Sequence, residues 1–227
     1  MRVARSVGLA AIAVAAVMAT AQPAGATVTK HVSALGAGYK STPLGGVSSA
    51  SARFKAPSVS CANDTDFEVL YLGVTGLSSI NERNDYAVLY AACNHSLTLD
   101  YFGVAYTTDG GFQPLSVAIG DTIVTKLVET GTTTTATVVN VSDNTSVSST
   151  TTGDKDASVL IGDFGDPVIP TFDKVHFARP RVNGAQLDDP ATPVSRERLK
   201  NGDNLQIATN ALASGDIGFS IFFRSNA

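Results

Sequence analysis

The sequence predicts an all-β fold, a single sandwich or barrel. Short runs rich in Val, Ile, Thr, Tyr and Phe recur after residue 27, and Gly, Asn, Asp and Pro separate them. Helical periodicity is hard to find in the same region. Ten such runs with turn signals between them are typical of sandwiches and barrels. About 200 residues suffice for one domain of this class.

The strands are expected at 47–55, 67–75, 85–92, 97–107, 121–129, 133–142, 157–163, 172–178, 204–209 and 216–223. The Thr/Ser-rich stretch 130–152 could be a glycosylated stalk, but its β-branched residues favour a strand pair. Residues 27–40 are expected to form a loose N-terminal arm. Residues 185–203, with two prolines, are expected to form a long loop that can hold a helical turn. The β-sandwich domain therefore spans 41–227.

Residues 1–26 have the pattern of a signal peptide. Arg2 and Arg5 precede an apolar run from Val7 to Ala19, which is shorter than the roughly 20 residues that span a membrane. Small residues at Ala24 and Ala26 fit a cleavage site before residue 27. The pattern predicts a secreted chain without a membrane anchor, and its alanine content indicates a bacterial one. The four sequons, at Asn63, Asn94, Asn140 and Asn144, are then incidental.

The charge balance argues against two classes of partner. Without the signal peptide, 14 basic residues face 20 acidic ones, a net charge of −6. The densest basic group is the modest set Arg196, Arg198 and Lys200. Nucleic acids and anionic membranes are therefore not expected as partners, since binding to both depends on neutralising phosphates. The chain is expected to be a monomer.

The two cysteines, Cys61 and Cys93, are expected to form a disulfide. An even pair in an oxidising exterior favours this pairing, and a separation of 32 residues matches no zinc pattern. No metal or cofactor is expected.

Few residues offer a basis for catalysis. The three histidines, His31, His95 and His176, have no partner at metal-ligand spacing, and G-x-S-x-G is absent. Two acid pairs, Asp163 with Asp166 and Asp188 with Asp189, could hold Ca²⁺ or act as acid and base. Turn-forming aspartates are the interpretation we favour for them.

Several segments in order resemble the glutamic peptidase (eqolisin) family. The residues that carry the resemblance read TPLGGVSSASARFKAPSVSC (42–61), YLGVTG (71–76), DYFGVAY (100–106), VAIGDTIVTKL (117–127), ASVLIGD (157–163) and IPTFDKVHFARPRVNG (169–184). Each match is weak alone, but order and spacing agree over about residues 40–184. The resemblance implies an antiparallel two-sheet β-sandwich of concanavalin-like, jelly-roll type, with a cleft on one sheet.

The resemblance also implies acid-pH peptidase activity by a Gln/Glu pair, and this pair is missing. The matching positions read Tyr90 and Ser158, and a second family acid falls at Gly162. No Gln occurs between Gln22 and Gln113, so no shift of register restores the pair. No catalytic residue is therefore assigned.

The cleft walls that are tryptophans in the family are expected to be Tyr71, Tyr86, Tyr90 and Phe102. These rings could bind an extracellular peptide, protein or glycan, or simply fill the groove. The sequence thus predicts a secreted non-catalytic relative of the peptidases. Two alternatives stay open: an acid hydrolase using other residues, such as Asp163 with Asp100, and a carbohydrate-binding module.

Overall fold

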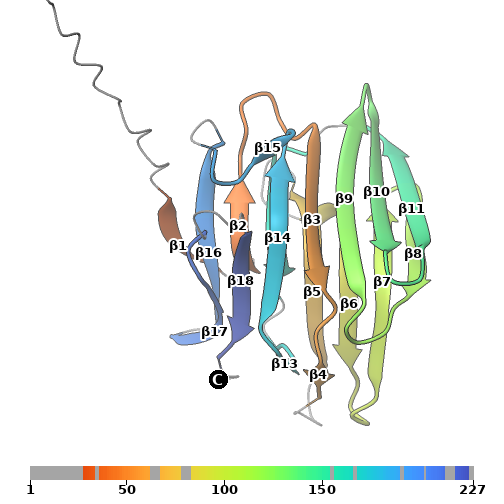
Figure 1. The fold of residues 1–227 in the computed structure, drawn as a ribbon, viewed down its shortest axis with the longest axis vertical. Coiled ribbons are helices and arrows are strands. Elements are labelled where there is room, and N and C mark those ends of the chain that lie inside the picture. Colours follow the sequence, from red (N-terminus) through yellow and green to blue (C-terminus); the bar gives the residue numbers. More distant parts are fainter. Residues whose placement is uncertain are drawn as a thin grey trace, which may run out of the picture.

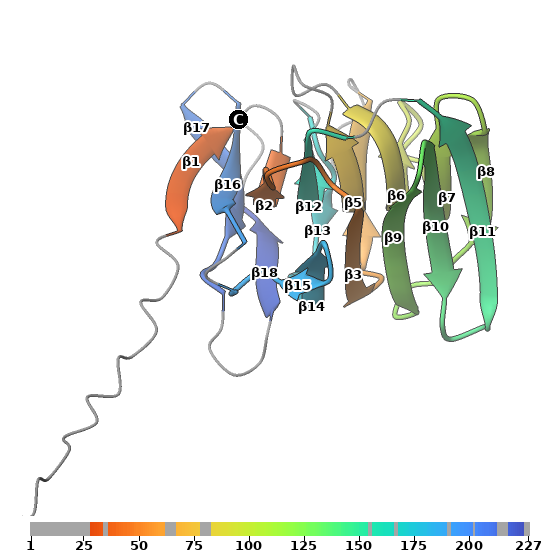
Figure 2. The same cartoon turned by 90° about the horizontal axis from the view of Figure 1, so that it is seen from above.

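The chain folds into two packed layers of strands. A computed structural model describes residues 28–33, 36–61, 67–77, 83–153, 156–165, 168–189, 192–201, 203–212 and 218–224. The predicted signal peptide lies outside these residues. The described part contains strands and no helix, which confirms the all-β, two-layer prediction, while the jelly-roll assignment stays a prediction. Figure 2 shows the two layers seen from above. No helix in the described part is long and apolar enough to cross a bilayer.

The strands are β1 (Thr29–Ser33), β2 (Gly36–Ser41), β3 (Ser49–Lys55), β4 (Val59–Ser60), β5 (Glu68–Leu77), β6 (Arg83–Cys93), β7 (Leu99–Thr107), β8 (Gly111–Ser116), β9 (Thr122–Thr130), β10 (Thr133–Asn140), β11 (Thr145–Thr152), β12 (Ser158–Phe164), β13 (Thr171–Phe172), β14 (Val175–Val182), β15 (Ala185–Gln186), β16 (Val194–Asn201), β17 (Asn204–Thr209) and β18 (Gly218–Phe223).

One hydrogen-bonded path runs through both layers, in the order β11-β10-β9-β3-β14-β18-β17-β16-β2-β12-β5-β6-β7-β8. Neighbours along this path are antiparallel, whereas β1 joins β16 in parallel. Strands β9, β10 and β11 pack face to face on β5, β6, β7 and β8. In Figure 1, β3, β9 and β14 lie in the front layer, with β5 and β6 behind them.

The core lies between the layers and follows the period-2 pattern of the strands. Alternate residues of β3 and β10 are buried, as expected for strands with one face on a core. Four aromatic rings contact one another in series through the middle of the core, in the order Phe54, Phe177, Phe219 and Tyr39, with centroids 4.8–5.0 Å apart. The Phe177–Phe219 pair is stacked, and the other two pairs are tilted. The apolar residues of the predicted strands therefore fill the space between the two layers.

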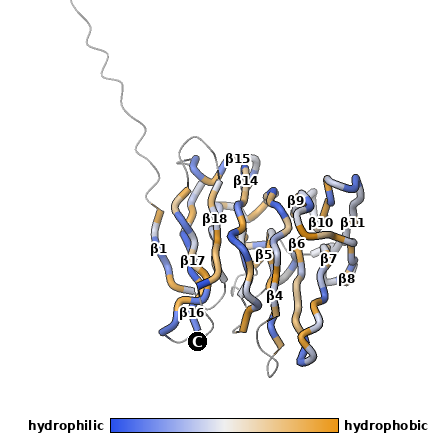
Figure 3. The backbone as a smooth tube through the Cα atoms, turned by 60° about the horizontal axis from the view of Figure 1, so that its bottom comes forward, coloured by the Kyte–Doolittle hydropathy of each residue, from blue (hydrophilic) through white to orange (hydrophobic). Residues whose placement is uncertain are grey.

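Two predicted irregular segments are strands instead. The arm predicted over 27–40 is wrong, because β1 pairs with β16 and β2 lies between β16 and β12. The loop predicted over 185–203 is also wrong, because most of it is β15 and β16. Strand β2 (GAGYKS) is rich in small residues and β16 (VSRERLKN) in charged ones, so neither is a run rich in Val, Ile, Thr, Tyr and Phe. Figure 3 shows the contrast between hydrophobic β6 and hydrophilic segments of β16.

The strand pair predicted over 130–152 is confirmed by β10 and β11. They pair in register from Thr133 with Thr152 to Asn140 with Thr145. Asn140 is fully buried, and its Nδ2 donates to Asp121 Oδ2 (2.7 Å) and Asp143 Oδ2 (3.0 Å). This sequon asparagine is therefore a structural residue at the end of β10.

Asp85 makes the stability of the sandwich depend on pH. The carboxyl is buried, and among the residues that the structure describes its Oδ2 has no hydrogen-bond partner. Burial raises its pKa, against a hydrogen bond from Thr108 N and with added repulsion from Glu129 and Asp109. The folded pKa lies above the unfolded one, so the contribution of Asp85 is present below the unfolded pKa and is lost as pH rises through the folded pKa.

We expect Asp85→Asn to raise the free energy of unfolding at pH 7 by about 1–2 kcal/mol, and to change it little at pH 3. The amide oxygen can still accept from Thr108 N (3.3 Å). Denaturant titrations at the two pH values measure the effect.

Asp109→Asn is the control of opposite sign, because hydrogen bonds from Thr151 Oγ1 and Thr152 N lower the pKa of Asp109. This control should be less stable than wild type at pH 7, and its difference from wild type should shrink as pH falls. Equal effects of Asp85→Asn at both pH values would contradict the assignment.

Candidate functional site: an aromatic surface on the outer face of one sheet

Six aromatic side chains gather on the outer face of strands β5 to β8. Residues two apart on a strand share a face, and directly paired residues lie on the same face. The register pairs Tyr71 with Tyr90, Tyr90 with Phe102, Tyr86 with Tyr106, and Tyr106 with Phe112. We call this group the aromatic surface, and its members are Tyr71, Tyr86, Tyr90, Phe102, Tyr106 and Phe112.

The rings of the aromatic surface touch in a continuous series. Their centroids are 4.8–6.2 Å apart in the pairs Tyr71–Tyr86, Tyr71–Tyr90, Tyr86–Tyr106, Tyr90–Phe102 and Phe102–Phe112. These separations are usual for interacting aromatic pairs. The Tyr86–Tyr106 pair is nearly parallel, at 16°. Five of the six rings are partly exposed, and Phe112 is 48% exposed. The rings therefore form a solvent-accessible surface.

A row of smaller residues lies beneath the rings. Val88 falls between Tyr86 and Tyr90 on β6, and its register partner on β7 is Val104. Both valines are 0% exposed, yet they do not belong to the core between the layers. The rings on either side cover them. The rings of the aromatic surface therefore pack over the outer face of the sheet and enclose a small apolar cluster of their own.

All four predicted cleft residues lie on this surface, together with two that the sequence analysis missed. Tyr106 lies on the same face as Phe102 by strand periodicity, four residues further on. Phe112 follows the predicted Asp109-Gly110 turn and pairs back to Tyr106. Continuing the alternation through that hairpin would have identified both residues.

The two positions that the resemblance matches to the family's catalytic pair, Tyr90 and Ser158, share this outer face but lie far apart. Tyr90 is opposite Tyr71 on β5, whereas Ser158 is opposite Leu77 on the other side of β5. Six residues of strand separate these two levels, which is about 20 Å. Tyr90 is partly exposed, and Ser158 is 3% exposed. One water molecule cannot contact both side chains across this distance.

Gly162, which the resemblance matches to a second family acid, has a backbone conformation that residues with a side chain rarely adopt. Its φ is +149°, and its partners Gly73 and Gly38 on the adjacent strands have φ of +155° and +141°. A Cβ on Gly162 would lie 2.0 Å from the carbonyl oxygen of Ala37. A carboxylate at this position would therefore require β2 and β12 to move apart.

The alternative carboxylate pair does not meet. Asp163 pairs with Leu72 and Ala37, whereas Asp100 pairs with Ala92 on the face of the rings. The two aspartates thus belong to opposite faces of the sheet. Asp163 is fully buried, and its Oδ1 accepts from Tyr71 N (2.9 Å). It is a strand residue that holds the backbone of β5, which corrects its interpretation as a turn aspartate.

The other candidate residues are scattered. His31 lies on β1, His95 in the turn after β6, and His176 on β14, and all three are exposed. Asp188 and Asp189 lie in the turn after β15. Asn63 and Asp166 fall outside the described residues.

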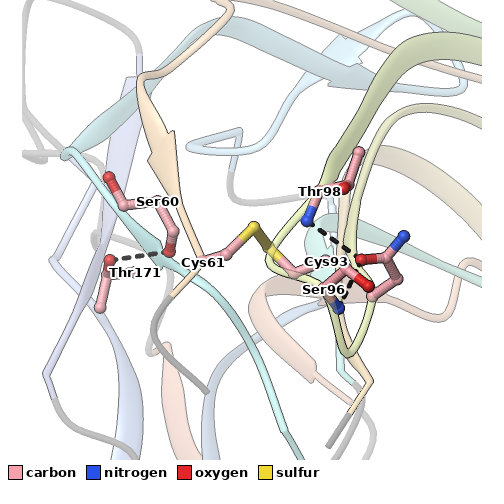
Figure 4. Close-up of a disulfide and its surroundings, with 7 residues drawn as sticks. Ser60, Cys61, Cys93, Ser96, Thr98 and Thr171 are labelled. Atoms are coloured by element: carbon pink, nitrogen blue, oxygen red, sulfur yellow. Dashed lines mark hydrogen bonds between the residues drawn. A yellow bond between two sulfur atoms is a disulfide. The ribbon is translucent and has the colours of Figure 1, made fainter. Parts of the chain in front are cut away.

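The predicted disulfide is confirmed. Cys61, just after β4, bonds to Cys93 at the end of β6, with a Cα–Cα distance of 5.5 Å (Figure 4). Glu68 pairs with Cys93 in the register, and its carboxylate lies within 4.8 Å of both sulfurs. This is the one group of three potential metal ligands among the described residues, and the disulfide occupies both of its sulfurs. In the adjoining turn, Asn94 Oδ1 accepts from Ser96 N and Thr98 N.

Comparison with known proteins agrees with this architecture. Scytalido-glutamic peptidase, solved with a transition state analog inhibitor, superposes with a TM-score of 0.60 at 14% identity, over 84% of this chain and 98% of that one. SCP-B, an Eqolisin family member solved with the tripeptide Ala-Ile-His, superposes with a TM-score of 0.51 at 13% identity and the same coverage. A sequence search of curated proteins found no significant match. At such identity the superpositions show the fold. The model of the Peptidase A4 family matches residues 33–221, most of the sequence, and the chain therefore belongs to the Peptidase A4 family.

Proposed function

We propose that this chain is a secreted, non-catalytic member of its family that binds an extracellular peptide on the aromatic surface. The observation that carries the proposal is the combination of two facts. The positions matched to the catalytic pair read Tyr90 and Ser158, and six touching rings cover the same face of the sheet.

The chemistry of the matched positions supports a non-catalytic role. Peptide hydrolysis by this family's pair needs a carboxylate to activate water and an amide to stabilise the oxyanion. Two hydroxyl side chains about 20 Å apart supply neither function. Asp100 and Asp163 lie on opposite faces of the sheet, so they cannot act together as a substitute carboxylate pair.

The aromatic surface has the properties of a binding site for an extended peptide. Tyrosine offers a large apolar face with little side-chain entropy to lose, and a hydroxyl that can hydrogen-bond to a peptide backbone. The surface is already ordered by ring-to-ring contacts, so binding would cost little reorganisation. The relatives with the same fold were solved with a peptide-based analog and a tripeptide, which favours a peptide as the ligand class.

A glycan is the second candidate. Carbohydrate rings bind by lying flat on aromatic faces, and the nearly parallel Tyr86–Tyr106 and Tyr90–Phe102 pairs offer extended aromatic area. The same experiment separates the two ligand classes.

The proposal predicts that truncating one central ring abolishes most of the binding. The secreted protein, immobilised, is challenged with a tryptic digest of casein and, separately, with soluble cello- and chito-oligosaccharides. We expect wild type to retain a subset of peptides, and Tyr90→Ala to lose at least about tenfold in affinity for them, as for a central aromatic contact. Tyr90 touches both Tyr71 and Phe102, so its loss opens the middle of the surface.

The matched control is Phe67→Ala, which removes an aromatic ring that is 48% exposed and lies outside the surface. It should bind like wild type. Denaturant titration of each variant separates lost binding from lost folding. If wild type retains oligosaccharides and no peptides, the ligand of the aromatic surface is a glycan and not a peptide. Equal retention by wild type and a folded Tyr90→Ala variant would refute the aromatic surface as the site.

A further inference from the structure

A basic pocket lies on the opposite side of the sandwich from the aromatic surface. Four basic side chains line it: Arg53 and Lys55 from β3, and Lys174 and His176 from the start of β14. Thr122, Phe54 and Ala178 complete the lining, and the pocket has a volume of about 390 Å³. The layer that carries it, with β3 and β14 side by side, is the front layer of Figure 1.

The strand register gathers these charges. Arg53 and Lys55 are two residues apart on β3, so both project from the outer face. Ala178 pairs with Arg53, and its small side chain leaves room beside the guanidinium. His176 Nδ1 lies 3.2 Å from Ser220 Oγ on β18, a contact that orients the imidazole.

The charge of the pocket is uncompensated within the described part of the chain. No carboxylate lines it, and Arg53, Lys55 and Lys174 form no ion pair there. Asp121, next to Thr122, is held toward β10 through its bond from Asn140 Nδ2. Asp173, next to Lys174, is exposed and is not a lining residue. Four basic groups without an acid are unexpected in a chain whose net charge is −4.

The usual structural reason for surface lysines on a sheet does not apply. Charged residues often protect edge strands from pairing with other chains. Strand β3 lies between β9 and β14, and β14 lies between β3 and β18, so both are interior strands. Like charges that are neighbours on one face are destabilising, and an anion bound between them would offset that cost.

We propose that this pocket binds a phosphate group. An Arg fork, two lysines and a histidine are the donors that bind tetrahedral oxyanions in proteins, and their spacing around one pocket suits a single such group. The group can come from free phosphate or from a phosphate-bearing extracellular polymer. The second source would place the protein on an anionic matrix while its aromatic face stays open.

Isothermal titration calorimetry at low ionic strength tests the proposal, with inorganic phosphate and with short-chain polyphosphate as the probes. We expect at least one probe to bind wild type, Arg53→Gln and Lys55→Gln each to weaken it at least about fivefold, and the double variant to abolish it. Without the probe, Lys55→Gln should be as stable as wild type or more stable, because repulsion is relieved. The matched control is Lys126→Gln, which removes an exposed charge from the same face outside the pocket and should change affinity less than about twofold.

Binding of inorganic phosphate itself would identify a small-anion site. Binding of polyphosphate alone, lost in the double variant, would identify a polymer site. Failure of both probes to bind wild type would overturn the proposal. Equal weakening by Lys126→Gln and Lys55→Gln would also overturn it, since the attraction would then be a general property of the face. These outcomes are independent of peptide binding, because the two sites lie on different layers.

Discussion

Gly162→Ala is expected to lower the free energy of unfolding by more than about 3 kcal/mol, near the upper end of single-substitution effects. Two penalties combine at this position. The backbone has φ +149°, which L-residues rarely adopt, and the new Cβ would lie 2.0 Å from the Ala37 carbonyl oxygen. Strand β12 is central, with β2 on one side and β5 on the other. The clash can be relieved only by separating paired strands.

Two other glycines separate these penalties. Gly131 has φ +64° and open space around its Cβ position, so Gly131→Ala should cost only about 1 kcal/mol. Gly153 has open space and no positive φ, so Gly153→Ala should stay within about 0.5 kcal/mol of wild type. Denaturant titration of the series measures all three values. If Gly162→Ala is as stable as Gly131→Ala, β2 and β12 can move apart at little cost in free energy, and the prediction is contradicted.

Removal of the disulfide is expected to have an effect of similar size. The Cys61–Cys93 bond closes a loop with a separation of 32 residues, which constrains the unfolded chain by about 3–4 kcal/mol in the chain-entropy treatment. The double variant Cys61→Ala/Cys93→Ala should lose roughly that much free energy of unfolding, and roughly 10 °C in melting temperature for a domain of this length. Alanine avoids placing a hydroxyl at the fully buried Cys93 position.

Reductant supplies the control for the disulfide. Wild type in reductant should approach the stability of the double variant, and the double variant should not respond. A double variant whose free energy of unfolding is within about 0.5 kcal/mol of that of oxidised wild type would contradict the stabilising role of the disulfide. If the double variant also loses stability in reductant, the reductant acts on something other than this disulfide.

The recurrence of short runs rich in Val, Ile, Thr, Tyr and Phe, separated by turn residues, was the reliable signal in this chain. It located β17 at residues 204–209 and placed β3, β5, β6, β9 and β10 within a few residues. Strands β3, β9 and β10 lie with one face on the core, and their burial alternates with period 2. Strand β6 was placed correctly even though both of its faces are largely covered, because its residues are strongly β-forming.

The strands that were missed depend on contacts that the local sequence does not encode. Strand β2 contains two positive-φ glycines that pair with Gly162 and Phe164 of β12, more than 120 residues away. The charged strand β16 pairs with β2 and β17 along the main path of strands, and β1 pairs with it off that path. Such pairing is decided by tertiary structure, which overrides propensity.

The candidate site was predicted in part for the same reasons. The four rings named from the resemblance lie together because they alternate on strands that pair directly. Tyr106 and Phe112 were not predicted, because Phe112 joins the other rings only through the hairpin that pairs it with Tyr106. The role of Asp163 was misjudged, because its hydrogen bond to Tyr71 N joins positions 92 residues apart.

Ser158 and Gly162, the positions that the resemblance matches to two acids of the family, are both unfavourable for a carboxylate. A carboxylate in place of Ser158 would be buried. A carboxylate in place of Gly162 would need a backbone conformation that residues with a side chain rarely adopt. The outer face of this sheet is instead committed to packed rings. The chain thus has the fold of its family and carries six packed rings on the outer face of this sheet.

The most direct test of the central claim is the fate of peptides that the protein retains. The purified chain is incubated with the casein digest between pH 2 and 7, with pepstatin present to exclude contaminating aspartic peptidases, and the products are followed by mass spectrometry. The account predicts that the retained peptides stay intact at every pH. New peptide termini that increase with time, and that persist across the purification of the protein, would contradict it.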